Sequence, residues 1–201
     1  LLNTTWTNDK RDSLIYTTSG SLQRAYAEIG LPGADLKFYK VNYQHQKFFP
    51  LTKEITLMLN GEFGLGDGYS GETLPFFRNF YAGGMGSVRG FKSGSLGPKD
   101  VYPNDENALG GNRRLVGNAE FLMPIPGFGL DKSFRFGGFF DAGYVWATGE
   151  KMRLSDLRYS VGVSVAWASP FGPLKVSVAQ PLNKKSGDQI ERFQFQMGTS
   201  F

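Results

Sequence analysis

The feature that most constrains the fold is a two-residue alternation of apolar and polar side chains that recurs along most of the chain. Successive side chains of a β-strand point to opposite faces, so each alternating run predicts one strand with one apolar face. No helical period is convincing, which predicts an all-β fold of about eight full strands of roughly ten residues. The runs lie at residues 22–31, 39–49, 55–65, 115–123, 134–146, 159–167, 174–178 and 193–201, with a shorter one at 2–7.

Two architectures share this alternation: a soluble sandwich, which turns its apolar faces inward, and a membrane barrel, which turns them toward lipid. Strands of about 9–11 residues are long enough to cross a bilayer at a tilt. Short connections at 50–52 and 169–172 alternate with longer ones at 66–112 and 183–191, as in outer-membrane barrels. The pattern favours an antiparallel transmembrane β-barrel over the sandwich. Aromatic residues near strand ends are expected to form its interfacial girdles: Phe134, Trp146, Tyr159 and Trp167.

Composition argues against several other classes of function. The sequence has no cysteine and a single histidine, His45, so neither a catalytic triad nor a zinc site is predicted. We therefore expect no enzymatic activity, no metal and no cofactor. The net charge is +4, but lysine and arginine are scattered rather than gathered in a basic stripe. This favours ordinary surface charge, or contact with anionic membrane lipid, over a nucleic-acid partner.

One long segment, residues 66–112, shows no strand period. Segments of that length inside a compact domain are usually functional or disordered. This one combines glycines, which permit tight turns, with aromatic residues, which disordered segments lack. The strong charge at its centre is Arg89. Two interpretations are open: a surface loop with a solvated arginine, and a loop that folds back into the protein and inserts Arg89 as a fixed cation.

Two carboxylates belong to the polar faces of consecutive predicted strands. By the alternation, Glu120 and Asp141 both point toward the inside of a barrel. Consecutive strands joined by a short turn are antiparallel neighbours, so we expect these residues within a few rungs of each other. Neighbouring carboxylates repel unless a cation lies between them, and the guanidinium of Arg89 could serve both. The alternative is that both are solvated in a water-filled lumen.

The segment Asn79–Phe91, which ends in Val88-Arg89-Gly90-Phe91, resembles the loop signature of the BamA family of outer-membrane assembly barrels. The resemblance extends over essentially the whole chain and matches the C-terminal part of such a barrel, with about eight or nine strands and a long inward-folding loop. We therefore expect residues 1–201 to be the C-terminal part of an outer-membrane β-barrel domain. Further matching pieces follow in the same order: Gly110-Gly111-Asn112, Ala119-Glu120-Phe121, Asp141–Trp146, Ser169–Leu174, Ala179-Gln180-Pro181 and Phe193–Gly198.

The resemblance implies a function in folding and inserting β-barrel proteins into the outer membrane of Gram-negative bacteria, without ATP or a covalent step. Implied partners are client outer-membrane proteins, periplasmic accessory lipoproteins and membrane lipid. It also implies that Arg89 is held in the lumen by Glu120 and Asp141. The implied C-terminal strand signal comprises Phe193, Phe195, Met197 and Phe201. Alternatives are TamA-like assembly, two-partner polypeptide export and a passive porin.

The chain opens at Leu1 as though cut from a longer protein, and the family's periplasmic repeats and first strands are expected upstream. A sheet that starts in mid-barrel exposes unpaired backbone groups at its edges. We therefore expect this piece to self-associate by pairing its edge strands with those of another copy, or to curl into a smaller barrel.

Overall fold

A computed structural model describes residues 1–14, 16–31, 33, 36–100, 107–125, 133–170 and 172–198. It confirms the all-β prediction: nine strands form one antiparallel sheet in the order β1-β2-β3-β4-β6-β7-β8-β9-β11, and β5 pairs separately with β10. Among the described residues, no helix is long and apolar enough to cross a membrane. The strands are β1 (Leu2–Asp9), β2 (Gly20–Ile29), β3 (Phe38–Pro50), β4 (Thr56–Gly68), β5 (Gly90–Phe91), β6 (Arg113–Met123), β7 (Phe134–Trp146), β8 (Arg158–Ser169), β9 (Gly172–Pro181), β10 (Ile190–Glu191) and β11 (Phe193–Met197); the single-turn helices are η1 (Phe76–Arg78) and η2 (Leu154–Asp156).

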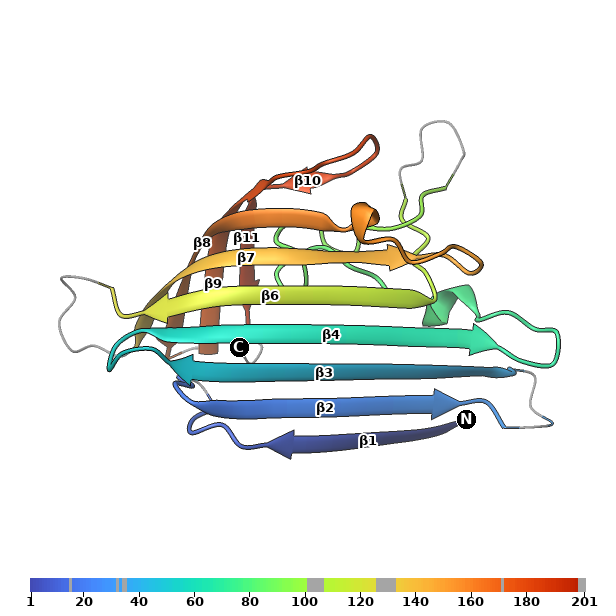
Figure 1. The fold of residues 1–201 in the computed structure, drawn as a ribbon, viewed down its shortest axis with the longest axis horizontal. Coiled ribbons are helices and arrows are strands. Elements are labelled where there is room, and N and C mark those ends of the chain that lie inside the picture. Colours follow the sequence, from blue (N-terminus) through green and yellow to red (C-terminus); the bar gives the residue numbers. More distant parts are fainter. Residues whose placement is uncertain are drawn as a thin grey trace.

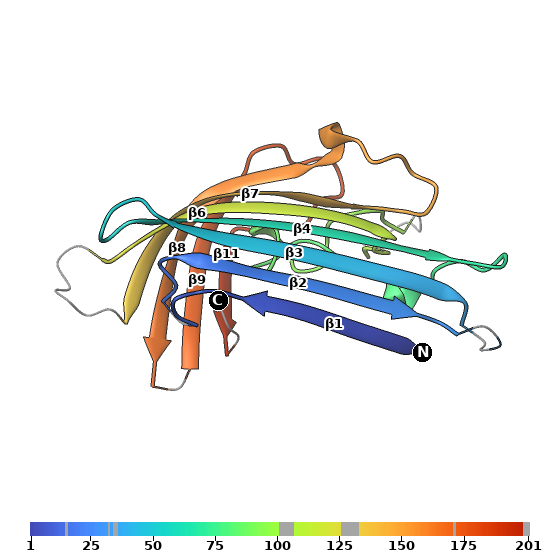
Figure 2. The same cartoon turned by 60° about the horizontal axis from the view of Figure 1, so that its bottom comes forward.

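The large sheet is a meander that curves into a trough, with β1 and β11 at its two edges (Figures 1 and 2). The middle of the connection between β4 and β6, from Phe80 to Leu96, lies on the concave side of this trough (Figure 2). The centre of the segment that the sequence predicted to lack strand period therefore occupies the inside of the curve.

The two faces of the sheet differ as the alternation predicts. Neighbouring residues of β7 illustrate this: Phe140 on the convex face is 42% exposed, whereas Asp141 on the concave face is fully buried. The rings of Phe134 and Trp167 stack at 5.3 Å where β7 and β8 pair. The convex face thus presents an apolar belt, made of side chains that include Trp6, Val41, Tyr43, Leu59, Phe63, Phe121, Phe140, Val163, Val178 and Phe195.

The prediction is wrong for one of the expected girdle residues. Trp146, at the end of β7, is only 1% exposed, and its indole N–H donates to Asp156 at 3.4 Å. The contact with Asp156 of η2 and the edge-on packing against Tyr144, with ring centroids 5.4 Å apart, accompany this burial, although the alternation assigns Trp146 to the apolar face. Phe201, expected to end the last strand, lies outside the described residues.

The segment between β1 and β2, residues 10–19, reaches across to the sheet end where β7 and β8 meet. Two backbone carbonyls of this segment, those of Tyr16 and Thr17, accept hydrogen bonds from Arg135 at 3.3 and 2.8 Å. The Tyr16 hydroxyl donates to the carbonyl of Ser133 and accepts from the amide of Ala168. We call residues 10–19 the strap, because their hydrogen bonds connect the β1–β2 edge of the sheet to β7 and β8, which lie far from it in the sheet order.

Candidate functional site: an inward loop held by a buried ion cluster

The loop between β4 and β6 is packed by its own apolar residues against the concave face. Its backbone folds on itself through bridges that pair Phe80 with Gly111 and Ala82 with Leu96. These bridges bring buried side chains of the loop against the concave side of β6 and the end of β7. The resulting hydrophobic cluster contains Phe80, Ala82, Val88, Phe91 and Leu96 from the loop and Val116 and Val145 from the strands.

Arg89 lies at the centre of this packing and is only 3% exposed. Its Nε and Nη2 donate to the two carboxylate oxygens of Asp141 at 2.7 and 2.8 Å, and its backbone N–H donates to the same carboxylate at 3.0 Å. The guanidinium carbon lies 3.4 Å from the ring centroid of Phe139. Ionised bidentate pairs of this kind are among the strongest hydrogen bonds in proteins. Asp141 therefore fixes both the side chain and the backbone of the loop.

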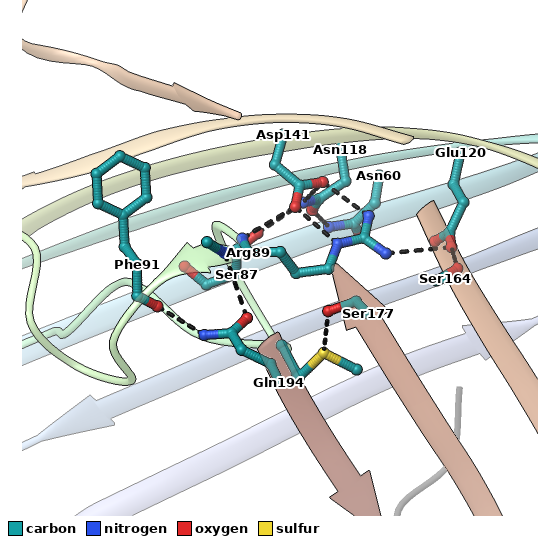
Figure 3. A network of polar contacts seen from close by, with 12 residues as sticks. Asn60, Ser87, Arg89, Phe91, Asn118, Glu120, Asp141, Ser164, Ser177 and Gln194 are labelled. Atoms are coloured by element: carbon teal, nitrogen blue, oxygen red, sulfur yellow. Dashed lines mark hydrogen bonds and ion pairs between the residues drawn. The ribbon is translucent and has the colours of Figure 1, made fainter. Parts of the chain in front are cut away.

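Glu120 closes the cluster from the neighbouring strand. Its carboxylate lies 3.1 Å from Nη1 of Arg89 and accepts from Ser164 at 2.5 Å and from Lys175 at 3.1 Å. The cluster therefore contains two cations and two anions, which come from the loop and from β6, β7 and β9. Figure 3 shows three of them, Arg89, Glu120 and Asp141. Because unpaired buried charges are costly, this balance explains how Glu120 and Asp141 can be almost completely buried.

The hydrogen bonds that Arg89 donates to Asp141 and the charge of Glu120 also affect the proton affinity of the loop arginine. Burial by itself would lower the pKa of Arg89, but these two carboxylates raise it above its ordinary value. The guanidinium consequently keeps its charge throughout the pH range in which the carboxylates are ionised. The cluster offers a fixed electrostatic anchor rather than an acid–base pair.

A row of side-chain amides connects the anchor to two more strands, β3 and β4. Asn118 donates to Asp141 at 2.8 Å and to the carbonyl of Ser87 at 2.6 Å. Asn60 donates to Asn118 at 2.9 Å, and Gln44 donates to Asn60 at 3.0 Å. The amide row thus runs from β3 through β4 and β6 to Asp141 on β7.

Close approach requires glycine at one position of the cluster. A Cβ on Gly137 would lie 2.6 Å from both Glu120 Oε1 and Ser164 Oγ, a distance that real Cβ atoms do not show. The absence of a side chain at this position of β7 therefore leaves the space that the Glu120 carboxylate occupies.

The structure brings Arg89, Glu120 and Asp141 together, and Val88 and Phe91 lie in the cluster around them. Phe193, Phe195 and Met197 lie on the convex face of β11, about 60% exposed, which does not bear on their expected signal role. His45 is exposed on β3. Within the part of the chain that the structure describes, no group of three or more histidine, aspartate or glutamate residues could hold a metal ion.

Sequence reasoning missed several members of the cluster. Lys175 and Ser164 share the small or polar face of their strands, so the alternation could have placed them inside with Glu120. Their pairing with Glu120 joins strands that are not neighbours in the sheet: one strand lies between β6 and β8, which carries Ser164, and two lie between β6 and β9, which carries Lys175. Strand parity predicts the face of the sheet on which a side chain lies. The curvature that brings Lys175 Nζ within 3.1 Å of the Glu120 carboxylate is not a local property of the sequence.

The chain is similar in sequence and in structure to several known proteins. The outer membrane protein assembly factor BamA of Neisseria meningitidis is 44% identical over 98% of this chain, and a SAM50-like protein of Schizosaccharomyces pombe is 28% identical over all of it. The crystal structure of BamA from Haemophilus ducreyi lacking POTRA domains 1–3 superimposes with a TM-score of 0.90 at 30% identity, covering 99% of this chain and 42% of that one.

The chain spans 28% of the length of the Neisseria protein, so it corresponds to a part of such a relative. The model of the Omp85 superfamily domain matches residues 1–201, from the first strand to the end of the chain. This protein chain therefore belongs to the Omp85 superfamily.

Proposed function

We propose that residues 1–201 are the C-terminal part of an outer-membrane β-barrel domain, in a protein that folds and inserts other β-barrel proteins into the outer membrane of a Gram-negative bacterium. Its partners are membrane lipid, client outer-membrane proteins and periplasmic accessory lipoproteins. The work involves no covalent step, cofactor or metal. The support comes from the similarity to assembly factors named BamA over nearly the whole chain.

The observation that carries the proposal is the loop held inside the trough by Arg89. An apolar convex face suits lipid contact, since the outward side chains of a transmembrane barrel are apolar. The concave face carries the buried loop anchor and the polar residues around it. A protein that only had to sit in a membrane would not need a buried, charge-balanced anchor for a 44-residue connection, residues 69–112, between two strands.

The test is reconstitution of the full-length protein in liposomes, with an unfolded outer-membrane protein supplied as client. We expect client insertion, followed as protection from protease, to be faster than in empty liposomes. Arg89→Ala should slow insertion, whereas Arg114→Ala should not, because Arg114 pairs with Glu62 at 2.9 Å on another part of the concave face. Equal insertion with and without the protein would refute the proposal.

Two other functions give different results in the same liposomes. A passive porin would show a steady, large conductance and no effect on client insertion. A two-partner exporter would move a polypeptide across the bilayer into the lumen of the liposome rather than leave it inserted. A TamA-like protein would accelerate autotransporter clients only, so the client panel should include both autotransporters and simple barrels.

A further inference from the structure

The tip of the inward loop is attached to the last strands of the sheet as well as to the ion cluster. Directly after Arg89, β5 forms a two-residue ladder with β10, in which Gly90 pairs with Glu191 and Phe91 with Ile190. The amide of Lys92 donates to the carbonyl of Gln189 at 2.9 Å. A few residues of the loop thus contact β6 and β7 on one side and the β9–β11 connection on the other.

Gln194 adds a direct connection from β11. This side chain points to the concave side and is 5% exposed, between the outward-facing Phe193 and Phe195. Its Nε2 donates to the carbonyl of Phe91 at 2.8 Å, and its Oε1 accepts from the amide of Gly90 at 3.4 Å (Figure 3). The carboxamide therefore pairs with the backbone of the loop much as a neighbouring strand would.

The contact is tight enough to require glycine. Gly90 has a φ of +88°, and a Cβ at this position would lie 3.0 Å from Cβ of Ala179 and 3.3 Å from the ring of Pro181. The loop backbone therefore lies directly against the concave side of β9. Ser177, also on β9, donates to the sulfur of Met85 at 2.9 Å.

The β9–β11 connection is itself fixed to the body of the sheet. Arg158 of β8, 4% exposed, donates to the two carboxylate oxygens of Asp188 at 2.6 and 3.2 Å. The segment that carries β10 is consequently held at both ends, by β8 and by the loop.

β11 depends on such contacts more than other strands do. Among the described residues it pairs with β9 over five residue pairs, from Phe193 to Met197, with one further backbone hydrogen bond on each side, whereas β8 and β9 share ten pairs. Within the described part of the chain, β9 is the only strand that forms a ladder with β11. An edge strand with a short ladder is expected to open at a low free-energy cost.

We propose that Gln194 is a positioning residue that joins the Arg89 anchor to the last strand, so that the loop and β11 move as one unit. This inference rests on the proposed function for its biological meaning. Release of Arg89 should loosen β11, and loss of Gln194 should loosen the loop. Because coupling between two sites is reciprocal, both directions must be observed.

The experiment is hydrogen–deuterium exchange on the full-length protein in membranes, without any client. With Gln194→Ala, we expect amides of residues 84–92 to exchange roughly fivefold faster, the size of effect that loss of one or two net hydrogen bonds gives. With Arg89→Ala, amides of residues 193–197 should exchange faster although Arg89 does not touch β11. The matched control is Gln180→Ala, which removes an exposed glutamine from β9.

Reciprocal effects in the two variants support the coupling, and unchanged exchange of β11 in Arg89→Ala overturns it. If Gln194→Ala fails to assemble, Gln194→Glu keeps the volume and the acceptor for Gly90. It loses the donor to the carbonyl of Phe91 and to the carboxylate of Glu191 at 3.3 Å, and unchanged loop exchange in that variant also overturns the inference. Client insertion is measured separately. Coupled exchange without client insertion would refute the proposed function and leave the role of Gln194 standing.

Discussion

Removal of the Arg89 side chain should undock the loop long before it unfolds the sheet. In Arg89→Ala, Asp141 loses its two side-chain hydrogen bonds from Arg89 and keeps that of Asn118, whereas Glu120 keeps Lys175 and Ser164. Breaking one partner of a buried ion pair costs about 3–5 kcal/mol. The full figure applies because Arg89 and Asp141 are 3% and 0% exposed, which leaves little solvent screening.

The two carboxylates should differ in importance. Asp141→Asn removes the charge that holds the Nε, Nη2 and backbone N–H of Arg89, so its effect on the loop should approach that of Arg89→Ala. Glu120→Gln leaves those bonds intact and should have a smaller effect. The triple variant with Arg89→Ala, Asp141→Asn and Glu120→Gln should release the loop little more than Arg89→Ala alone does, since the three substitutions break one shared interaction.

The assay is protease sensitivity of the loop in the full-length protein, with client insertion measured in parallel. Loop cleavage in Arg89→Ala should rise by roughly two orders of magnitude or more, from the free energy above. Arg114→Ala is the control, because it breaks an ion pair of the concave face that is not part of the loop anchor. Fully additive losses, or a defect in Glu120→Gln as large as that in Asp141→Asn, would refute this account of the cluster.

Three further predictions follow from separate contacts. Gly137→Ala should lower the free energy of unfolding by about 1–3 kcal/mol, because the added methyl group overpacks against Glu120; thermal unfolding measures this. Gly138→Ala is the matched control, because a Cβ there meets nothing within 4 Å. Equal destabilisation in the two variants would argue against the close approach of Gly137 and Glu120. Arg135→Ala should free the strap and raise the conductance of the full-length protein in planar bilayers. The control Arg24→Ala, which changes an exposed arginine of β2, should leave the conductance unchanged. Equal conductance of the two variants would mean that the strap does not limit ion passage. The 201-residue chain alone should self-associate in detergent through its edge strands, since unpaired backbone groups are costly in an apolar medium; a dispersed monomer by mass measurement would contradict this.

The sequence predicted the fold better than it predicted the site. Strict alternation identified the faces of the strands, and parity aimed Glu120 and Asp141 at the concave side, where both are found. Trp146 shows the limit of parity, because a residue on the apolar face is buried when other segments cover it. Lys175 and Gln194 show a second limit: both have the right parity, but their partners come from segments 55 and about 100 residues away. Local periodicity carries no information on such distances.

The amide row has a consequence for how the sheet reaches its register. Asn60 lies directly opposite Asn118, and Asn118 directly opposite Asp141. A slip of β4 by one residue would turn the Asn60 carboxamide to the convex face, because side chains change sides at every residue. In lipid, each polar group left without a partner costs several kcal/mol. The row therefore disfavours every slip of β3, β4, β6 or β7 by an odd number of residues, because such a slip turns an amide toward the lipid.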